Sequence, residues 1–180
     1  MFARPDQILN YLALTPGMKV ADFGAGSGEY VLGLARRVAP GGRVIAVDIQ
    51  PELLTKIAGQ AKASNLGDIV DTIWGDVETR GGSKLADQAV DVVILSNIMF
   101  QVDSAYSLAL EAKRVLNLAG KVLVVDWKDS FGNLGPTKDK VITPAKCEQI
   151  MNEAGLIKDN EFEAGDHHYG QIYVLNQSKL

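Results

Sequence analysis

The sequence predicts a single α/β domain in which helices cover both faces of a mostly parallel sheet. Short apolar runs rich in β-branched residues alternate with helical patterns along the 180-residue chain. Residues 90–95 form a continuous apolar run, as expected for a strand that is buried on both faces. Three alternating glycines at 24–28 connect the first strand to the first long helix, the junction where doubly wound sheets bind ligands.

The elements follow one another with clear turn signals between them. An amphipathic start at 5–12 is followed by a turn at Pro16-Gly17. The expected strands are 18–22, 43–47, 69–74, 90–95, 120–127, 156–163 and 169–175. The expected helices are 30–38, 51–64, 104–116 and 144–153. Five strand–helix units that end in a hairpin favour a parallel sheet with right-handed crossovers.

Composition narrows the class of protein. A net charge of −4 and a pI near 5.2 make nucleic acid an unlikely partner. The single Cys147 forms no internal disulfide, which fits a reducing cytoplasm. No apolar stretch reaches the roughly 18 residues of a membrane span, and the first residues lack a signal-peptide core. The two histidines are adjacent and have no metal-ligand spacing, so we expect no metal site.

The glycine-rich turn indicates the kind of cofactor. The dinucleotide fingerprint requires glycine three residues after its second glycine, but Glu29 follows Gly26 at that distance. Glu29 and Asp22 would both repel a pyrophosphate, whereas they suit a ligand with a cationic part. S-adenosylmethionine carries a sulfonium and an ammonium group and has no phosphate. We therefore expect this cofactor rather than a dinucleotide.

The residues that follow the first three strands resemble those of class I S-adenosylmethionine-dependent methyltransferases, over nearly the whole chain. Residues 22–28 resemble the family's D-x-G-x-G-x-G loop, which wraps the methionine end of the cofactor. Asp48 resembles the acid that holds both ribose hydroxyls, and 75–77 resemble the adenine clamp. The predicted cofactor contacts are Asp22, Gly24, Ala25, Gly26, Gly28, Asp48, Ile49, Asp76, Val77 and Asn97.

The resemblance also implies an architecture and a branch of the family. It implies a Rossmann-like sheet of order 3-2-1-4-5-7-6 whose last strand is antiparallel. The chain is most similar to type 11 methyltransferases, which include ubiquinone/menaquinone C-methyltransferase-like proteins. Residues 114–121 depart from the family's R-V-L-K-P-G-G approach to the fifth strand, because Asn117, Ala119 and Lys121 replace Lys, Pro and the second Gly.

Several candidate residues also have a purely structural interpretation. Asp76 is typical of turns, and Asp22 can fix its own turn through backbone amides. Asn97 ends the fourth strand and is interpreted either as a cofactor contact or as a loop residue. No catalytic residue is evident. The candidates are His167, His168 and Asp126, with both histidines expected in an exposed loop at 164–168.

The segments expected around the acceptor are rich in loops. We expect an N-terminal helix or lid at 1–15 and a substrate-side lid at 128–142. Residues 2–8, 99–100 and 164–169 should complete the acceptor pocket. The expected partner is a small-molecule acceptor, and the expected state is a monomer or a homodimer.

The resulting hypothesis is methyl transfer by in-line displacement, with S-adenosylhomocysteine as the product. An activated cofactor leaves the protein mainly to align the reactants. Arsenite methylation, known among relatives, uses several cysteines, which disagrees with the single Cys147. An NAD-type oxidoreductase is disfavoured by Glu29. A non-catalytic cofactor-binding subunit of a methyltransferase complex is the remaining alternative.

Overall fold

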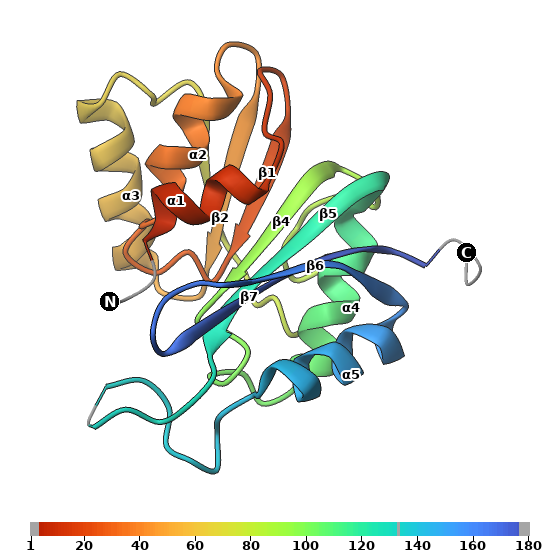
Figure 1. The fold of residues 1–180 in the computed structure, drawn as a ribbon. Coiled ribbons are helices and arrows are strands. Elements are labelled where there is room, and N and C mark those ends of the chain that lie inside the picture. The colour runs from red at the N-terminus through yellow and green to blue at the C-terminus, as the bar shows by residue number, and fades with distance from the viewer. Residues whose placement is uncertain (1–3, 133, 177–180) are drawn as a thin grey trace.

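The computed structural model describes residues 4–132 and 134–176. They form a seven-stranded sheet of order β3-β2-β1-β4-β5-β7-β6 (Figure 1). The strands are β1 (Lys19–Phe23), β2 (Arg43–Asp48), β3 (Val70–Trp74), β4 (Val90–Ser96), β5 (Leu116–Trp127), β6 (Leu156–Glu163) and β7 (His168–Leu175). The helices are α1 (Pro5–Ile8), the 3-10 helix η1 (Leu9–Tyr11), α2 (Val31–Val38), α3 (Pro51–Ala63), α4 (Ala105–Val115) and α5 (Pro144–Ala154).

The strand pairing confirms the predicted sheet order and the antiparallel last strand. β1 pairs in parallel with β2 on one side and with β4 on the other. β7 lies antiparallel between β5 and β6. The carboxyl ends of β1 to β5 therefore lie at one edge of the sheet, together with the turn that connects β6 to β7.

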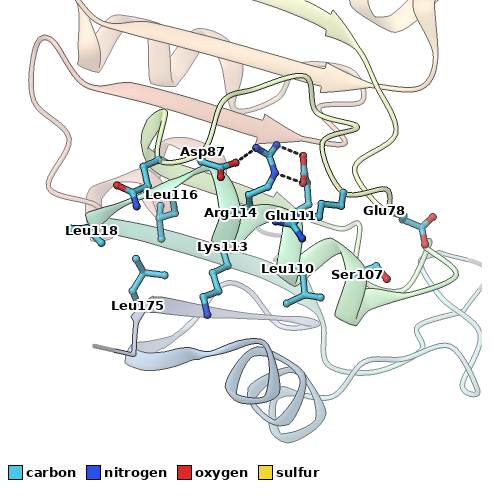
Figure 2. Close-up of a pocket in the computed structure, with 12 residues that line it drawn as sticks. Glu78, Asp87, Ser107, Leu110, Glu111, Lys113, Arg114, Leu116, Leu118 and Leu175 are labelled. Atoms are coloured by element: carbon cyan, nitrogen blue, oxygen red, sulfur yellow. Dashed lines mark hydrogen bonds and ion pairs between the residues drawn. The ribbon is translucent and has the colours of Figure 1, made fainter. Parts of the chain in front are cut away.

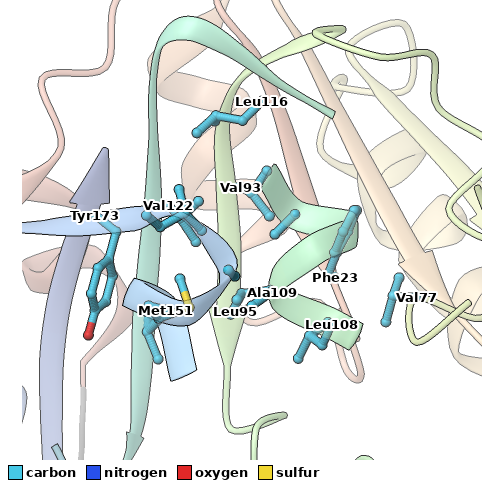
Figure 3. Packing of buried hydrophobic residues seen from close by; sticks show 14 of the residues in the cluster. Phe23, Val77, Val93, Leu95, Leu108, Ala109, Leu116, Val122, Met151 and Tyr173 are labelled. Atoms are coloured by element: carbon cyan, nitrogen blue, oxygen red, sulfur yellow. The ribbon is translucent and has the colours of Figure 1, made fainter. Parts of the chain in front are cut away.

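Two apolar cores hold the helices against the sheet. In Figure 1, α1, α2 and α3 cover one face, and α4 and α5 cover the other. Figure 3 shows the second core, where Phe23, Leu95 and Leu108 pack together and Met151 lies near Tyr173. All five of these side chains are fully buried. Their burial makes the sheet a rigid support for the loops at its edge.

The helix ends follow from local sequence. Ser104 caps α4 by accepting a hydrogen bond from the backbone N–H of Ser107, at 3.1 Å. Thr143 caps α5 in the same way, and Pro144 occupies the first turn, where no N–H is required. Gly155 ends α5 in the left-handed conformation, with φ of +90°.

The fifth strand begins earlier than the sequence predicts. Pairing with β4 starts at Leu116, and the register shifts between Val90 and Val92 to accommodate the extra residues. Asp91 lies at this irregularity, and its carboxylate accepts hydrogen bonds from the Asn117 side chain at 2.6 Å and from the Lys19 N–H at 2.7 Å. Asn117, where the sequence departs from the motif that it resembles, thus has a partner in β4.

Candidate functional site

The glycine-rich loop leaves β1 with a tight left-handed path. Gly24 and Gly28 have φ of +69° and +81°, which side chains on L-residues rarely adopt. A Cβ on Gly28 would lie 2.8 Å from Ile57 Cγ1, so the loop is also packed against α3. Asp48 fixes its path from the neighbouring strand, since one carboxylate oxygen accepts from the Gly26 N–H at 2.8 Å. Its other oxygen accepts from the Gln50 N–H at 2.9 Å.

A cavity of about 210 Å³ lies between the loops that follow β1, β2 and β3. Six predicted cofactor residues line it, namely Gly24, Gly26, Asp48, Ile49, Asp76 and Val77. Asp48 is 7% exposed, and each carboxylate oxygen has a second lone pair beyond its backbone hydrogen bond. Ile49 is 60% exposed and offers an apolar surface at the rim. The cavity combines apolar walls with a buried double acceptor.

A second cavity of about 160 Å³ continues from the same loop toward β4. Asp22, Ala25 and Asn97 line it, and Gly24 and Gly26 line both cavities. The structure thus brings nine of the ten predicted cofactor residues to two adjoining cavities. Gly28 is the tenth; it lines neither cavity and packs against Ile57 of α3.

Two side-chain oxygens in the second cavity lack partners. Asp22 Oδ2 and Asn97 Oδ1 are buried and accept no hydrogen bond from any described residue. Burial, followed by the charges of Asp48 and Glu29, raises the pKa of Asp22 to about 7. Buried acceptors are rarely left unpaired, because each costs roughly 1–3 kcal/mol. The cavity is therefore built to receive a donor, and a cation would also stabilise the Asp22 carboxylate.

The backbone at the end of β4 aims Asn97 at this cavity. Asn97 has φ of +53°, and its N–H donates to the Val125 carbonyl at 2.8 Å. Its own carbonyl accepts from the side chain of Gln101. Asparagine tolerates this left-handed conformation better than most residues. The contacts hold the strand end in a fixed turn beside the glycine-rich loop.

Asp76 lies at the rim and organises its own turn. One carboxylate oxygen accepts from the Glu78 N–H at 3.0 Å, and the other from the Thr79 hydroxyl at 3.0 Å. The turn-forming interpretation thus describes real contacts, and each carboxylate oxygen keeps a second lone pair. Val77 is buried beneath this turn.

Two of the three catalytic candidates, Asp126 and His168, are buried, and the exposed-loop position expected for His168 is wrong. Asp126 is fully buried and accepts hydrogen bonds from the backbone N–H groups of Met99, at 3.0 Å, and Trp127, at 2.7 Å. It joins the loop after β4 to the end of β5. His168 belongs to β7 rather than to an exposed loop, because antiparallel pairing extends to Trp127 opposite it. Burial, with a smaller effect from His167, lowers the pKa of His168 to about 4.

His167 is the candidate that remains partly exposed. Its side chain is 24% exposed and lies in the turn between β6 and β7. Its Nδ1 is 2.9 Å and 3.1 Å from the two carboxylate oxygens of Asp129, which follows β5. The ring of Phe131 stacks on the imidazole with centroids 3.9 Å apart. The two loops that carry these residues are therefore joined at the carboxyl edge of the sheet.

Sequence reasoning missed several lining residues. Tyr30, Ser96, Ile98 and Gln101 line one or both cavities, although the predicted cofactor contacts include none of them. Tyr30 is the first residue of the helix expected at 30–38, and burial, followed by the charges of Asp22 and Glu29, raises the pKa of its hydroxyl. No sequence signal marked Gln101, whose position depends on the turn after β4. Ser96 could have been found from its position, because it ends β4 at the carboxyl edge of the sheet.

A third cavity of about 440 Å³ lies beside α4 (Figure 2), and Glu78, in the loop after β3, lines both this cavity and the first one. Its centre is an ion cluster in which Arg114 pairs with Glu111 at 2.7 Å and with Asp87 at 2.6 Å. Glu111 also accepts from the Gly81 N–H and the Ser83 hydroxyl. These contacts tie the loop after β3 to α4. The charges are already paired, so the cluster supports the site rather than forming a second one.

Within residues 4–132 and 134–176 no group of three or more His, Cys, Asp or Glu side chains is arranged to hold a metal ion. Among the same residues no helix is both long and apolar enough to cross a membrane.

The fold and the paired cavities define a class of protein that binds a nucleoside cofactor with a cationic end at the carboxyl edge of a doubly wound sheet. Residues 14–174 match the family model described as a methyltransferase domain. The chain therefore belongs to the class I S-adenosylmethionine-dependent methyltransferases. The predicted family and cofactor are confirmed at this level.

The relatives in sequence and structure agree with this family. An arsenite methyltransferase from Halobacterium salinarum is 32% identical over 116 residues, which cover 64% of this chain and 29% of that protein. A ubiquinone/menaquinone biosynthesis C-methyltransferase from Bordetella parapertussis is 31% identical over 127 residues, 71% of this chain and 47% of that protein. The chain thus spans less than half the length of either relative. The structure of an S-adenosylmethionine (SAM)-dependent methyltransferase from Aquifex aeolicus shares the fold, with a TM-score of 0.85 and 24% sequence identity. The match covers 96% of this chain and 89% of that one.

Proposed function

We propose that the chain transfers the methyl group of S-adenosylmethionine to a small-molecule acceptor. The observation that carries the proposal is the pair of buried, unpartnered oxygens of Asp22 and Asn97 in the cavity beside the glycine-rich loop. An ammonium group supplies the donors that these oxygens lack, and its charge offsets the cost of ionising a buried carboxylate. The phosphate groups of a dinucleotide would instead be repelled by the carboxylates of Asp22 and Glu29, which line the same cavity.

The residues present fit the whole cofactor. Asp48 would accept from the ribose hydroxyls, and Ile49 and Val77 would enclose the adenine, with Asp76 accepting from its amino group. Gly24 to Gly28, including Ala25, would pass close to the methionine end, because no large side chain intervenes there. When bound, the cofactor supplies a methyl group on a positively charged sulfur. The chain's own task is to hold that carbon in line with the acceptor.

The acceptor side is proposed between the N-terminal segment and the β6–β7 turn. A hollow of about 720 Å³ is bordered by α1, η1, the residue after β5 and the β6–β7 turn, with Arg4, Tyr11, Lys128 and Glu163 among its lining residues. Tyr11 stacks on Phe162 with ring centroids 3.7 Å apart, which fixes the N-terminal segment to β6. This supports lid roles for 1–15 and 128–142. Residues 1–3 and 133 lie outside the described residues.

The single thiol bears on the arsenite alternative suggested by one relative. Cys147 is fully buried in α5, and its Sγ lies 3.7 Å from the Tyr173 hydroxyl oxygen. Burial raises its pKa to about 11, so the reactive thiolate is disfavoured. An organic acceptor therefore suits these residues better than a metalloid. A lone reduced thiol also supports the expected cytoplasmic location.

Calorimetric titration with S-adenosylhomocysteine tests the cofactor site, with NADH as the comparator. We expect micromolar binding that Asp48→Ala weakens by roughly 2–4 kcal/mol, since a charged double acceptor is lost. Asp71→Asn is the matched control, because Asp71 is an exposed acid on β3 and should leave affinity unchanged. NADH binding without S-adenosylhomocysteine binding would refute the proposal. Tight product binding with no turnover on any small acceptor would favour the non-catalytic subunit.

A further inference from the structure

Exposed leucine side chains gather around the third cavity. Leu110 of α4 is 40% exposed, and Leu118, near the start of β5, is 56% exposed. The buried side chains of Leu116 and Leu175 complete the apolar lining of this cavity of about 440 Å³. Pockets that bind small molecules usually have volumes of about 300–1,000 Å³. The third cavity therefore has the size and the apolar lining of a ligand site.

The apolar surface extends beyond the third cavity. An adjoining hollow of about 470 Å³ shares Leu118 and Leu175 with it and is also lined by Ile157 and Val174. Ile157 lies in the edge strand β6 and is exposed. Contiguous exposed apolar surface of this kind marks interaction sites. An elongated apolar group can thus lie along both hollows.

Each acid that lines the third cavity already has a partner. Arg114 pairs with both Glu111 and Asp87. The Glu78 carboxylate accepts a hydrogen bond from the Ser104 N–H at 2.7 Å. A cationic group that entered the cavity would have to compete for carboxylates that are already bonded.

Two cations that line the same cavity are not paired. Neither Arg80 nor Lys113 forms a hydrogen bond or an ion pair with any residue in 4–132 or 134–176. Figure 2 shows Lys113 between Leu110 and Leu175. Its Nζ lies beside the end of α5, since a Cβ built on Gly155 would be 2.6 Å from it. The charge that is available to a ligand is therefore positive and lies next to the apolar surface.

The apolar part of the third cavity lies away from the proposed methyl-transfer site. Leu116 begins β5 and Leu175 ends the antiparallel β7, so both lie at the edge of the sheet opposite the carboxyl ends of β1 to β5. The two cofactor cavities lie at the carboxyl edge. A molecule bound against these leucines would therefore be a different ligand from the methyl acceptor.

We propose that the third cavity binds an amphipathic carboxylate, with its alkyl chain against the exposed leucines and its head group at Lys113 and Arg80. Burial of the chain removes apolar surface from water on both sides. The carboxylate accepts charge-assisted hydrogen bonds from the two cations. This inference does not rest on the proposed function, because no step of methyl transfer involves these residues.

The first test uses decanoate as the probe and decylammonium as the comparator with the same chain and the opposite charge. We expect calorimetric titration to give a Kd below about 1 mM for decanoate and binding at least about 10-fold weaker for decylammonium. With ¹³C-labelled leucine methyl groups, decanoate should shift the NMR signals of Leu110, Leu118 and Leu175. A decanoate Kd above this limit, or shifts confined to other leucines, would overturn the site. Equal affinity for the two probes would overturn the anionic class.

The second test removes the charged and the apolar parts of the site separately. The double variant Arg80→Gln/Lys113→Gln should bind decanoate about 10-fold more weakly and decylammonium within about 3-fold of the wild type. Leu118→Glu should weaken decanoate binding at least about 10-fold, because it places a carboxylate on the apolar surface. Lys56→Gln is the matched control, since Lys56 is exposed on α3, over the other face of the sheet. Unchanged decanoate affinity in folded double and Leu118→Glu variants would overturn the proposal.

The oligomeric state distinguishes a small ligand from a second copy of the chain on the same surface. Equilibrium sedimentation should give the same mass for the wild type and Leu118→Glu. A wild-type dimer that Leu118→Glu dissociates, and that decanoate does not, would show that a second copy covers the leucines. That result would overturn the proposal.

Discussion

Replacing Asp22 with Asn should stabilise the free protein while it weakens cofactor binding. The pKa of Asp22 is raised from 3.8 to about 7, so the folded state holds its proton more tightly than the unfolded state does. Between these values the unfolded state binds fewer protons, and the free energy of unfolding falls as the pH rises. The full difference of about three pKa units corresponds to about 4 kcal/mol above pH 7. Asn avoids this cost because it has no charge to desolvate.

The assay is urea unfolding of the free protein at about pH 4 and about pH 8. We expect Asp22→Asn to exceed the wild type by up to about 4 kcal/mol at the higher pH and to match it near the lower one. Asp126, whose pKa burial also raises to about 7, contributes the same slope to both proteins and cancels in the difference. Asp71→Asn, an exposed control, should stay within about 0.5 kcal/mol.

The same substitution should have an unfavourable effect on cofactor binding. A bound ammonium favours the Asp22 carboxylate, so Asp22→Asn should weaken S-adenosylmethionine binding by at least about 1.5–3 kcal/mol. The wild-type affinity should also fall below about pH 7, where binding must displace a proton. The reasoning would be refuted by a variant no more stable than the wild type at the higher pH, or by unchanged cofactor affinity.

Three further substitutions test the supports of the site. Gly28→Ala forces a side chain to φ of +81° and against Ile57, and should lower stability by about 1–3 kcal/mol in thermal unfolding; an unchanged Tm contradicts the loop packing. Glu111→Gln should lower the free energy of unfolding in urea by about 3 kcal/mol near pH 7. Burial raises the pKa of Glu111, but the hydrogen bonds that its carboxylate accepts outweigh this effect and lower the pKa to about 2. That contribution is complete above pH 4.5 and is lost as the pH falls toward 2, so a pH-independent difference would argue against it. Gly135→Ala places a Cβ about 2.5 Å from the Trp127 ring and should reduce acceptor turnover while S-adenosylhomocysteine affinity stays within about 3-fold; equal losses of both would argue against a lid.

The part of the fold that sequence predicts well is the part governed by short-range signals. Apolar runs and turn glycines located all seven strands, mostly to within one residue of the bounds observed. The early start of β5 escaped prediction, because the residues that meet there, Val90 with Leu116 and Asp91 with Asn117, are 26 positions apart in the sequence. Such long-range pairing leaves no periodic trace in the sequence.

The candidate site divides in the same way. The glycine-rich loop and Asp48 carry their own local signature, so their proximity in one pair of cavities could be anticipated. The burial of individual polar groups could not be anticipated from the sequence. Asp126 and His168 resemble exposed strand-end residues in the sequence, and only the antiparallel insertion of β7 encloses them. Asp129 gave no signal, since its partner His167 lies 38 positions away.

The insertion of β7 between β5 and β6 also has a consequence for the order of folding during synthesis. β6 pairs with β7 alone, and β7 is made after every other described strand. Until residues 168–175 leave the ribosome, β5 has an unpaired edge and β6 has no sheet to join. The half built on β1 to β4, which carries the glycine-rich loop and Asp48, meets no such delay. A nascent chain would thus assemble the half that carries the proposed nucleoside site first and enclose the proposed acceptor side last.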